Sequence, residues 1–420
     1  MNEKKRKPKI RFAGFTDDWE QRKLGELTTY RNGTGHEEKQ SDVGKYELVN
    51  LNSISIDGGL KPSGKFIDEE TETLIKDDLV MVLSDVGHGD LLGRVAIIPE
   101  NNRFVLNQRV ALLRNNDFAD IKYLFSYINA HQRYFKLQGA GSSQLNISRE
   151  SVEKFEVLLP SKDEQKKIGE YFSSLDTLIT LHQRKCDKLK YIKKSMLEKM
   201  FPKNGESVPE IRFEGFTNDW EQRKFSDVFT GLQNNTLSRS ELNYESGTVK
   251  NVHYGDVLIK FGDYIDASKE ELPFINDDSK VEKFKGSFLH NGDIIIADTA
   301  EDETVGKCTE IQGVDDIKLI SGLHTIPCRP KEEYGAKFLG YYMNSSAYHA
   351  QLIPLMQGIK VTSISKSALQ DTNMIIPKSV DEQTIIGEYF SNLDNLITLH
   401  QCKLVKLKNI KKSMLKKMFV

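Results

Sequence analysis

DEQKKIGEYFSSLDTLITLHQRKCDKLKYIKKSMLEKMF, residues 163–201, returns almost unchanged as DEQTIIGEYFSNLDNLITLHQCKLVKLKNIKKSMLKKMF, residues 381–419. We call these two segments the helix blocks. Apolar residues recur at steps of three and four through both, the spacing of a helix that pairs along one face. Ser161 with Glu164, and Ser379 with Glu382, form S-x-x-E capping boxes at the start. The sequence predicts two long helices, each about 55 Å in length at about 1.5 Å per residue.

The two predicted helices are expected to pair with each other as an antiparallel coiled coil. The predicted seam residues, at the apolar positions of the two blocks, are Ile168, Phe172, Leu175, Ile179, Leu189, Ile192, Ile386, Phe390, Leu393, Ile397, Leu407 and Ile410. Gly169 and Gly387 would each cost a helix about 1 kcal/mol. Their presence in both copies therefore predicts that another part of the chain approaches the helix closely there.

A second repeat precedes each variable region. RFAGFTDDWEQRK at 11–23 returns as RFEGFTNDWEQRK at 212–224, and each copy of this tryptophan block holds one of the chain's two tryptophans. Between the tryptophan block and the helix block lie two inserts, 28–159 and 229–376, which differ almost everywhere. The internal comparison indicates a shared frame that carries two different inserts.

Both inserts have the pattern of a mixed α/β module. In the first, strands are predicted at 45–56, 78–85, 93–98, 104–113 and 154–160, a helix at 119–137 and a polar loop at 139–148. The second follows the same order, with strands near TVKNVHYGDVLI, GDIIIAD and TNMIIP, a helix at about 335–352 and the loop at 357–365. The predicted fold is mixed α/β, with two similar globular domains separated by two long antiparallel helices in an internal pseudo-two-fold repeat.

The domain boundaries follow from these repeats. We predict a first domain at 1–160, a first spacer helix at 161–203, a second domain at 204–377 and a second spacer helix at 378–420. The charged start MNEKKRKPKI lacks the apolar region of a signal peptide. No apolar run approaches the roughly 18 residues of a membrane span. Four scattered cysteines without a C-x-x-C pair favour a reducing cytoplasm and no metal site.

The sequence contains none of the common catalytic signatures. It has no adjacent prolines for an Asn/Asp-Pro-Pro-aromatic motif, no phosphate loop, no H-E-x-x-H and no G-x-S-x-G. We therefore expect no catalytic residue in this chain.

The doubled order of these segments resembles one known family. GFTDDWEQRKLGEL, LLPSKDEQKKIGEYFSSLDTLI and IIPKSVDEQTIIGEYFSNLDNLI together are similar to the DNA-specificity (S) subunits of type I restriction–modification systems. The likeness covers essentially the whole chain. It implies that each insert is a target-recognition domain for one half of a split, asymmetric sequence in double-stranded DNA. It also implies that the helices set the distance between half-sites.

The resemblance further implies partners and no chemistry of its own. Methyltransferase (M) subunits, two in number, would dock on the helices, and restriction–translocase (R) subunits would join the full complex. The M subunit would bind S-adenosylmethionine and methylate adenine, so this chain would need no cofactor.

Candidate DNA contacts lie in loops that occupy matching places in the two inserts. They are Arg31, Asn32, His88, Arg94, Gln144, Asn146, Gln233, Asn234, Arg239, Lys360 and Thr362. Their amide, imidazole and cationic groups suit base edges or phosphates. The same composition is also that of ordinary polar turns. The lysines at the end of each helix block have two interpretations as well, a basic face for phosphate or a solvated helix end that complements the helix dipole.

The charge balance limits how the chain can bind DNA. The formal net charge is -2, with 29% charged residues, and each insert is more acidic than basic. Because phosphate neutralisation supplies most non-specific affinity, we expect tight binding only when M subunits add basic surface. Two other classes of function stay open: a scaffold whose modules bind proteins, and a nuclease or methyltransferase with an unfamiliar site.

Overall fold

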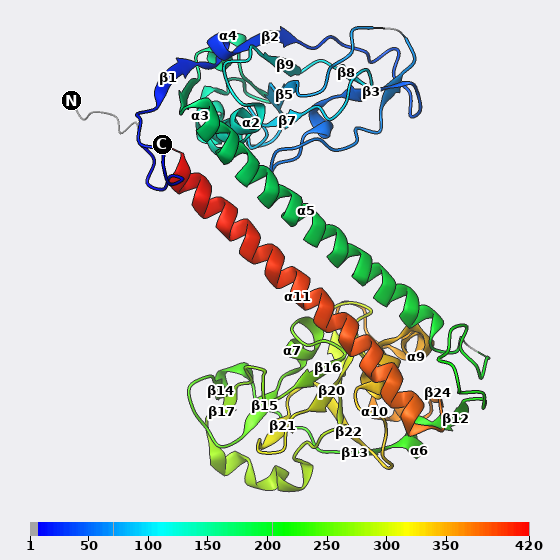
Figure 1. The fold of residues 1–420 in the computed structure, drawn as a ribbon. Helices are drawn as coiled ribbons and strands as arrows, with labels where there is room; N and C mark the ends of the chain where they lie inside the picture. The colour runs from blue at the N-terminus through cyan, green and yellow to red at the C-terminus, as the bar shows by residue number, and fades with distance from the viewer. Residues whose placement is uncertain (1–6, 70, 204, 420) are drawn as a thin grey trace. The chain divides into compact units, whose positions relative to one another are not determined.

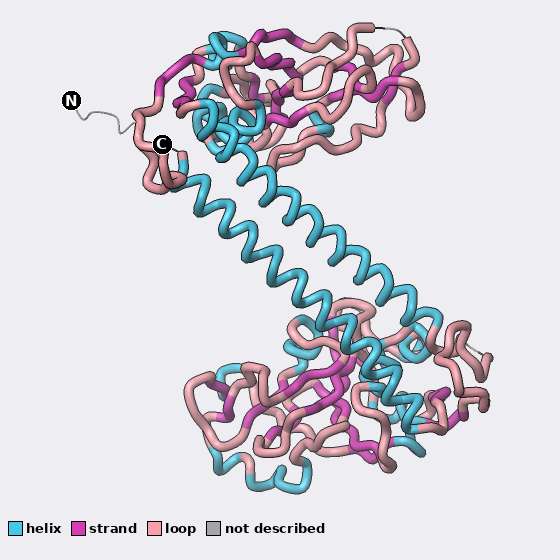
Figure 2. Tube along the Cα trace, viewed as in Figure 1, coloured by secondary structure: helices cyan, strands magenta, loops and turns pink. Residues whose placement is uncertain are grey.

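The computed structural model describes residues 7–69, 71–203 and 205–419. Most of the charged start that was predicted not to be a signal peptide, and the predicted boundary residues 204 and 420, lie outside these ranges. The chain divides into two compact units, unit 1 of Met1–Gln183 with Cys402–Val420 and unit 2 of Arg184–Gln401. Strands and helices are mixed in both, which confirms the predicted α/β class (Figure 2).

The two helix blocks form α5, Lys162–Lys199, and α11, Val380–Met418 (Figure 1). Each unit contains the first part of one helix and the last part of the other. The parts run antiparallel within each unit, because Asp176 meets Lys411 at 2.5 Å in unit 1 and Asp394 meets Lys193 at 2.7 Å in unit 2. The prediction of two long antiparallel helices is thereby confirmed.

Unit 1 is built on small sheets, mostly antiparallel. The largest has the order β2-β9-β5-β7, with β2 at Thr28–Asn32, β9 at Val110–Asn115, β5 at Leu79–Val82 and β7 at Val95–Ile97. A second has the order β4-β3-β8, at Phe66–Ile67, Tyr46–Val49 and Phe104–Leu106. Two strand pairs complete the unit, β1 (Glu20–Lys23) with β11 (Glu156–Leu159) and β6 (Ser84–Asp85) with β10 (Leu145–Asn146). The helices are α1 at Leu24–Leu27, α2 at Ile121–Ala130, α3 at Gln132–Gln138 and α4 at Arg149–Glu153.

Unit 2 has a five-stranded sheet of order β13-β22-β18-β20-β16. These strands are Phe229–Gly231, Thr325–Pro330, Ile294–Ala297, Cys308–Gln312 and Tyr264–Asp266. A four-stranded sheet has the order β14-β17-β15-β21, at Leu242–Asn243, Phe274–Ile275, Lys250–Val252 and Leu319–Ser321. The strand pairs are β12 (Glu221–Lys224) with β24 (Asn373–Ile376) and β19 (Thr299–Ala300) with β23 (Thr362–Ser363). The helices are α6 at Phe225–Val228, α7 at Tyr254–Ile259, α8 at Phe338–Asn344, α9 at Ser346–His349 and α10 at Lys366–Gln370.

The two units share one topology. Strands β13, β22, β18 and β20 follow the order of β2, β9, β5 and β7, and the parallel pair β15·β21 matches the parallel pair β3·β8. The prediction that both inserts are versions of one fold is confirmed. Unit 2 adds β16, which pairs in parallel with the edge strand β20.

One predicted strand is wrong over half its length. Within TVKNVHYGDVLI only Lys250–Val252 is a strand, and Tyr254–Ile259 is helix α7. The side chain of His253 accepts a hydrogen bond from the backbone N–H of Gly255 at 3.1 Å, and Asp256 lies in the first turn of the helix. A histidine N-cap is an uncommon start signal, and the β-branched residues around it dominated the sequence pattern.

The predicted capping boxes are correct for the serines and wrong for the glutamates. Ser161 and Ser379 accept the backbone N–H of the glutamate three residues on, at 3.4 and 3.3 Å. The glutamates do not turn back to the cap. Glu164 receives a bidentate contact from Arg11 at 2.7 and 2.8 Å. Tertiary pairing with the arginine displaces the local capping geometry.

The same ion pair recurs in unit 2, between Arg212 and Glu382 at 2.7 and 2.8 Å. Glu164 and Glu382 have side chains 0% and 2% exposed, so both carboxylates need a full set of partners. The hydrogen bonds to these glutamates raise the pKa of each arginine above its ordinary value. The first residue of each tryptophan block thus fastens to the first turn of a long helix.

The glutamine of each D-E-Q triplet ties the helix to backbone groups of the module. Gln165 accepts the N–H of Asp120 at 2.9 Å and donates to the carbonyl of Pro160 at 2.8 Å. Gln383 accepts the N–H of Gly335 and donates to the carbonyl of Pro377, both at 2.8 Å. Both contacts reach main-chain atoms, so the module's side chains can change while the attachment stays.

The last residues of each helix block enter a module core. Phe419 stacks on Phe172 at a centroid distance of 5.5 Å and belongs to the core cluster of unit 1. Phe201 stacks on Phe390 at 5.9 Å in the core cluster of unit 2. Trp19 and Trp220 are buried in the same clusters and make edge contacts at matching places, with Tyr123 and with Phe338. The tryptophans are therefore parts of the core.

The predicted seam residues differ in burial. Those near the helix starts are 8% exposed or less, and these are Ile168, Phe172, Leu175, Ile386, Phe390, Leu393 and Ile397. Leu189 and Ile192 pack on the core of unit 2, and Leu407 packs on the core of unit 1. Ile179 is half-buried, and Ile410 is 36% exposed. The helix starts pack mainly into the modules.

Gly387 is expected to be intolerant of alanine. A Cβ there would lie 2.3 Å from the carbonyl oxygen of Ala336, a backbone atom that cannot turn aside. Alanine ordinarily stabilises a helix by about 1 kcal/mol over glycine, but overpacking costs typically about 1–3 kcal/mol. We expect Gly387→Ala to lower the free energy of unfolding of unit 2. The measurement is urea unfolding followed by Trp220 fluorescence in a Trp19→Phe background. Asn395→Ala, at an exposed position of α11, is the control, and a gain in stability for Gly387→Ala would show the close approach to be absent.

Glu310 should make unit 2 less stable as pH rises. It is 2% exposed, accepts the N–H groups of Lys337 and Gly340 at the start of α8, and burial raises its pKa to about 7. Its stabilising contribution is complete below the unfolded pKa of 4.5 and is lost as pH rises through about 7, by up to ~3 kcal/mol. Glu310→Gln keeps a neutral side chain at every pH. It should flatten the decline between pH 5 and pH 8 in the same Trp220 assay, whereas an unchanged pH profile would exclude Glu310 as its source.

Candidate nucleic-acid interface

Both predicted polar loops fold into the same short hairpin. In hairpin 1, residues 140–146, Ala140 and Asn146 exchange two backbone hydrogen bonds of 2.9 Å. In hairpin 2, residues 357–363, Gln357 and Ser363 exchange bonds of 2.9 and 2.8 Å. Each turn uses a glycine with positive φ, at +135° for Gly141 and +120° for Gly358. The two modules thus present one backbone structure with different side chains.

Each hairpin is fixed to the module by a second strand. Asn146 pairs with Ser84 in β6, and the Ser84 hydroxyl donates to the Asn146 side chain. In unit 2, Ser363 pairs with Thr299 in β19. Each supporting strand directly follows an inner strand of the module's largest sheet, which ties the hairpin to that sheet. A fixed hairpin loses little conformational freedom when a ligand binds.

The hairpin tips are exposed and chemically unlike. Gln144 and Asn146 give tip 1 amide groups, with Gln144 half-buried and Asn146 exposed. Tip 2 carries Lys360, exposed, between Ile359 at 103% and Val361 at 54% exposure, with Thr362 half-buried behind it. Amides exchange hydrogen bonds with base edges, and a lysine with flanking apolar groups suits phosphate and thymine methyl contacts.

In unit 1, the candidate contacts Arg31 and Asn32 already have partners within the chain. Arg31, in β2, forms an ion pair with Glu72, and the Asn32 side chain accepts the Tyr30 hydroxyl at 2.6 Å. Among the described interactions, none joins a residue of hairpin 1 to Arg31 or Asn32. They lie on an edge strand of the four-stranded sheet, and their role in DNA contact stays a prediction.

In unit 2 the matching candidates are also held locally. The Gln233 N–H donates to Ser287, and Asn234 donates to the carbonyl of Gly322 at 3.3 Å. Arg239 binds Asp256 bidentately at 2.9 and 3.0 Å, which raises its pKa, so its charge is already paired. The Gln233 side chain remains exposed, and all three stay predicted contacts.

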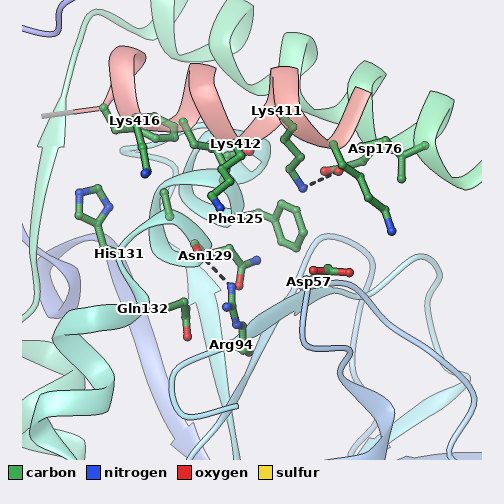
Figure 3. A pocket seen from close by; sticks show the side chains of 16 residues that line it. Asp57, Arg94, Phe125, Asn129, His131, Gln132, Asp176, Lys411, Lys412 and Lys416 are labelled. Carbon is green, nitrogen blue, oxygen red and sulfur yellow. Dashed lines mark hydrogen bonds and ion pairs between the residues drawn. The ribbon is translucent and has the colours of Figure 1, made fainter. Parts of the chain in front are cut away.

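His88 and Arg94 lie at different places on one loop. The loop joins β6 to β7, and the Asp85 side chain shapes it by accepting the N–H groups of Gly87 and Leu91. His88 is exposed. Arg94 turns inward and donates to the carbonyl of Asn129 at 3.1 Å, where burial lowers its pKa (Figure 3). The loop brings Arg94 toward the end of α11.

Of the lysines at the ends of the helix blocks, whose two interpretations the sequence left open, the structure places two groups in cavities, Lys408, Lys411 and Lys412 in unit 1 and Lys190, Lys193 and Lys194 in unit 2. Their identical spacing in the two helix blocks was the available signal. In the described ranges no group of three or more His, Cys, Asp or Glu side chains is arranged to hold a metal ion. Within those ranges, too, no helix is long and apolar enough to span a membrane.

The fold repeats one frame, and each copy presents a hairpin with the same backbone and different side chains. This arrangement defines a tandem recognition protein. The sequence matches the type I restriction modification DNA specificity domain over residues 16–191 and again over 217–409. The chain therefore belongs to this family and is a non-catalytic DNA-recognition subunit of a type I restriction–modification system. The two matches contain both helix blocks in large part and both inserts.

Individual relatives agree with this assignment. The chain is 23% identical over 416 residues to the type I restriction enzyme MjaVIII specificity subunit of Methanocaldococcus jannaschii, covering 95% of this chain and 91% of that one. It is 26% identical over 228 residues to the putative MjaX specificity subunit of the same organism, 51% and 53% of the two chains. The crystal structure of the S subunit from M. genitalium has the same fold, with a TM-score of 0.59 at 16% identity over 99% of both chains.

Proposed function

We propose that the chain reads a bipartite, asymmetric sequence in double-stranded DNA, with one half-site recognised by each module. The observation that carries this proposal is the pair of equivalent hairpins, identical in backbone bonding and unlike in side chains. A shared backbone sets the same approach to the duplex in both modules. Unlike tips then select unlike bases, because the major groove distinguishes all four base pairs by their hydrogen-bonding groups.

In this proposal α5 and α11 set the spacing between half-sites and dock two M subunits in the cytoplasm. Support comes from leucines repeated in both helix blocks yet left uncovered: Leu178, Leu181, Leu396 and Leu399 are 42–47% exposed. Uncovered apolar rows on a helix are typical of surfaces that bind another helix. S-adenosylmethionine would be bound by the M subunit, and R subunits would complete the assembly.

Adenine-methylation sequencing tests the proposal directly. A host that expresses a cognate M subunit should acquire a split methylated motif only when this chain is present. Exchange of residues 229–376 for the second insert of a relative should change one half of the motif and leave the other half and the spacing unchanged. If the M subunit co-purifies with the chain but no motif appears, the scaffold function replaces DNA reading. Methylation or cleavage by the purified chain alone would instead favour an unfamiliar enzyme.

The docking surface gives a second prediction. Leu181→Glu together with Leu399→Glu should abolish co-purification of M subunits, because burying a leucine contributes about 1.5–3 kcal/mol and a buried unpaired carboxylate opposes binding. The chain's own fold should persist, since both leucines are exposed. Circular dichroism checks helix content, and Thr180→Glu, on an exposed neighbouring position, is the control. Undiminished co-purification of the leucine double variant would place the M subunit elsewhere.

A further inference from the structure

One cavity of unit 1 is lined by more cations than carboxylates. It has a volume of about 670 Å³ and lies between α2, the loop before β7 and the last turns of α11 (Figure 3). Its five cationic side chains are Arg94, Lys408, Lys411, Lys412 and Lys416, against the two carboxylates of Asp57 and Asp176. We call it lysine pocket 1. Such an excess of positive charge around a hollow favours an anion.

Among the described residues, one of these cations has a carboxylate partner in a direct ion pair. Lys411 contacts Asp176 at 2.5 Å. Arg94 donates to backbone carbonyls of Asp90 and Asn129, and within the described part of the chain it forms no salt bridge. The same holds for Lys408 and Lys412 among the described residues. Burial lowers the pKa of Arg94, which means that its charge lacks full compensation where it stands.

Unit 2 contains an equivalent cavity, of about 430 Å³, which we call lysine pocket 2. Lys190, Lys193 and Lys194 line it, and a shift of 218 residues brings them onto Lys408, Lys411 and Lys412. Lys193 is again the neutralised member, held between Asp263 at 2.8 Å and Asp394 at 2.7 Å. In each pocket the lysines on either side of the paired one form no ion pair among the described residues. They can therefore bind a group from outside the chain.

Comparison of the two helix blocks shows that these lysines are retained, although some positions between and beside them differ. Asp187 stands where the second block has Val405, and Tyr191 where it has Asn409. A solvated helix end needs positive charge, but it does not need that charge at the same three positions beside a cavity. Three of the lysines that both blocks retain line a pocket in each unit.

We propose that lysine pockets 1 and 2 bind phosphate groups, supplied by the DNA backbone beside each half-site. This rests on the proposed DNA-reading function and adds to it a second set of contacts, made by the frame and indifferent to sequence. Flanking lysines act on phosphate as point charges with several donors. The loop that carries Arg94 into pocket 1 begins at β6, the strand that fixes hairpin 1. Base reading and phosphate binding therefore share one structural support.

The two pockets should differ in strength. Glu198 lines pocket 2 at the position that Lys416 occupies in pocket 1, and the neutral Asn344, Ser345 and Ser346 form the module wall of pocket 2. Pocket 1 thus has five cations to two carboxylates, and pocket 2 has three to two. Phosphate attraction is expected to be greater in pocket 1.

The test uses the full chain and a duplex that lacks the target motif, with fluorescence anisotropy over a range of salt concentrations. Lys408→Ala with Lys412→Ala should weaken binding about tenfold at low salt and reduce the salt slope by roughly 2, about 0.9 for each lost phosphate contact. Lys190→Ala with Lys194→Ala should act in the same direction and less strongly. Lys403→Ala with Lys406→Ala removes the same charge from exposed positions of α11 outside the pocket and should change little.

Two further arms identify the source of the anion. Inorganic phosphate should shift the unfolding temperature of the parent chain only at concentrations far above those of duplex. A shift at low phosphate concentration that the pocket 1 variant abolishes, without any effect on duplex binding, would assign the pocket to a free phosphate compound and overturn the DNA source. Co-purification of M subunits should be unaffected by the lysine variants. Loss of M binding with an unchanged salt slope would make the pockets protein contacts.

The methylation readout separates this inference from the proposed function. In the assembled complex the pocket variants should lower the extent of methylation while the split motif keeps both halves. If the motif is present and the salt slope equals that of the Lys403/Lys406 control, phosphate binding by the pockets is disproved and DNA reading stands. If no chain yields a motif, the proposed function itself fails.

Discussion

The structure depends on a buried arginine–glutamate pair that occurs once in each unit. Arg11 with Glu164, and Arg212 with Glu382, join the start of a tryptophan block to the first turn of a long helix across more than 150 residues of sequence. Breaking such a pair leaves a buried charge alone, at a cost of about 3–5 kcal/mol. The geometry between module and helix is therefore fixed at a point where neither partner can be lost alone.

This anchor explains how the inserts diverged without disturbing the frame. Gln165 and Gln383 contact only backbone N–H and carbonyl groups of the modules, and the phenylalanines that close the cores belong to the helix blocks themselves. To fit the frame, an insert must supply a backbone N–H group for the glutamine and an apolar surface on which the phenylalanine packs. Its hairpin tip is then free to vary, which is how one frame can carry Gln144 in one module and Lys360 in the other.

The sequence was sufficient for the frame because its signals were local and repeated. Helical spacing, serine caps and the glycine repeated in both blocks predicted α5, α11 and the close approach at Gly169 and Gly387, and the family resemblance led to the S-subunit fold. Contacts between residues far apart in the sequence could not be predicted. Glu164 prefers Arg11 to its own cap, and His253 starts a helix inside an apparent strand, because in both cases distant packing or an unusual cap outweighs local preference. The sequence predicted polar loops at 139–148 and 357–365 but not their hairpin bonding, and the ion pairs of Arg31 and Arg239 could not be foreseen from spacing.

The distribution of charge completes the physical account. The modules are acidic on balance, while the ends of the helix blocks place lysines in a cavity of each unit, in unit 1 beside the loop that supports hairpin 1. Under the proposed function, an acidic module repels random duplex, and contact becomes favourable where tip, pocket and backbone phosphates coincide. The proposed phosphate contacts belong to the repeated frame and the proposed base contacts to the differing tips, which would let specificity change without loss of general affinity.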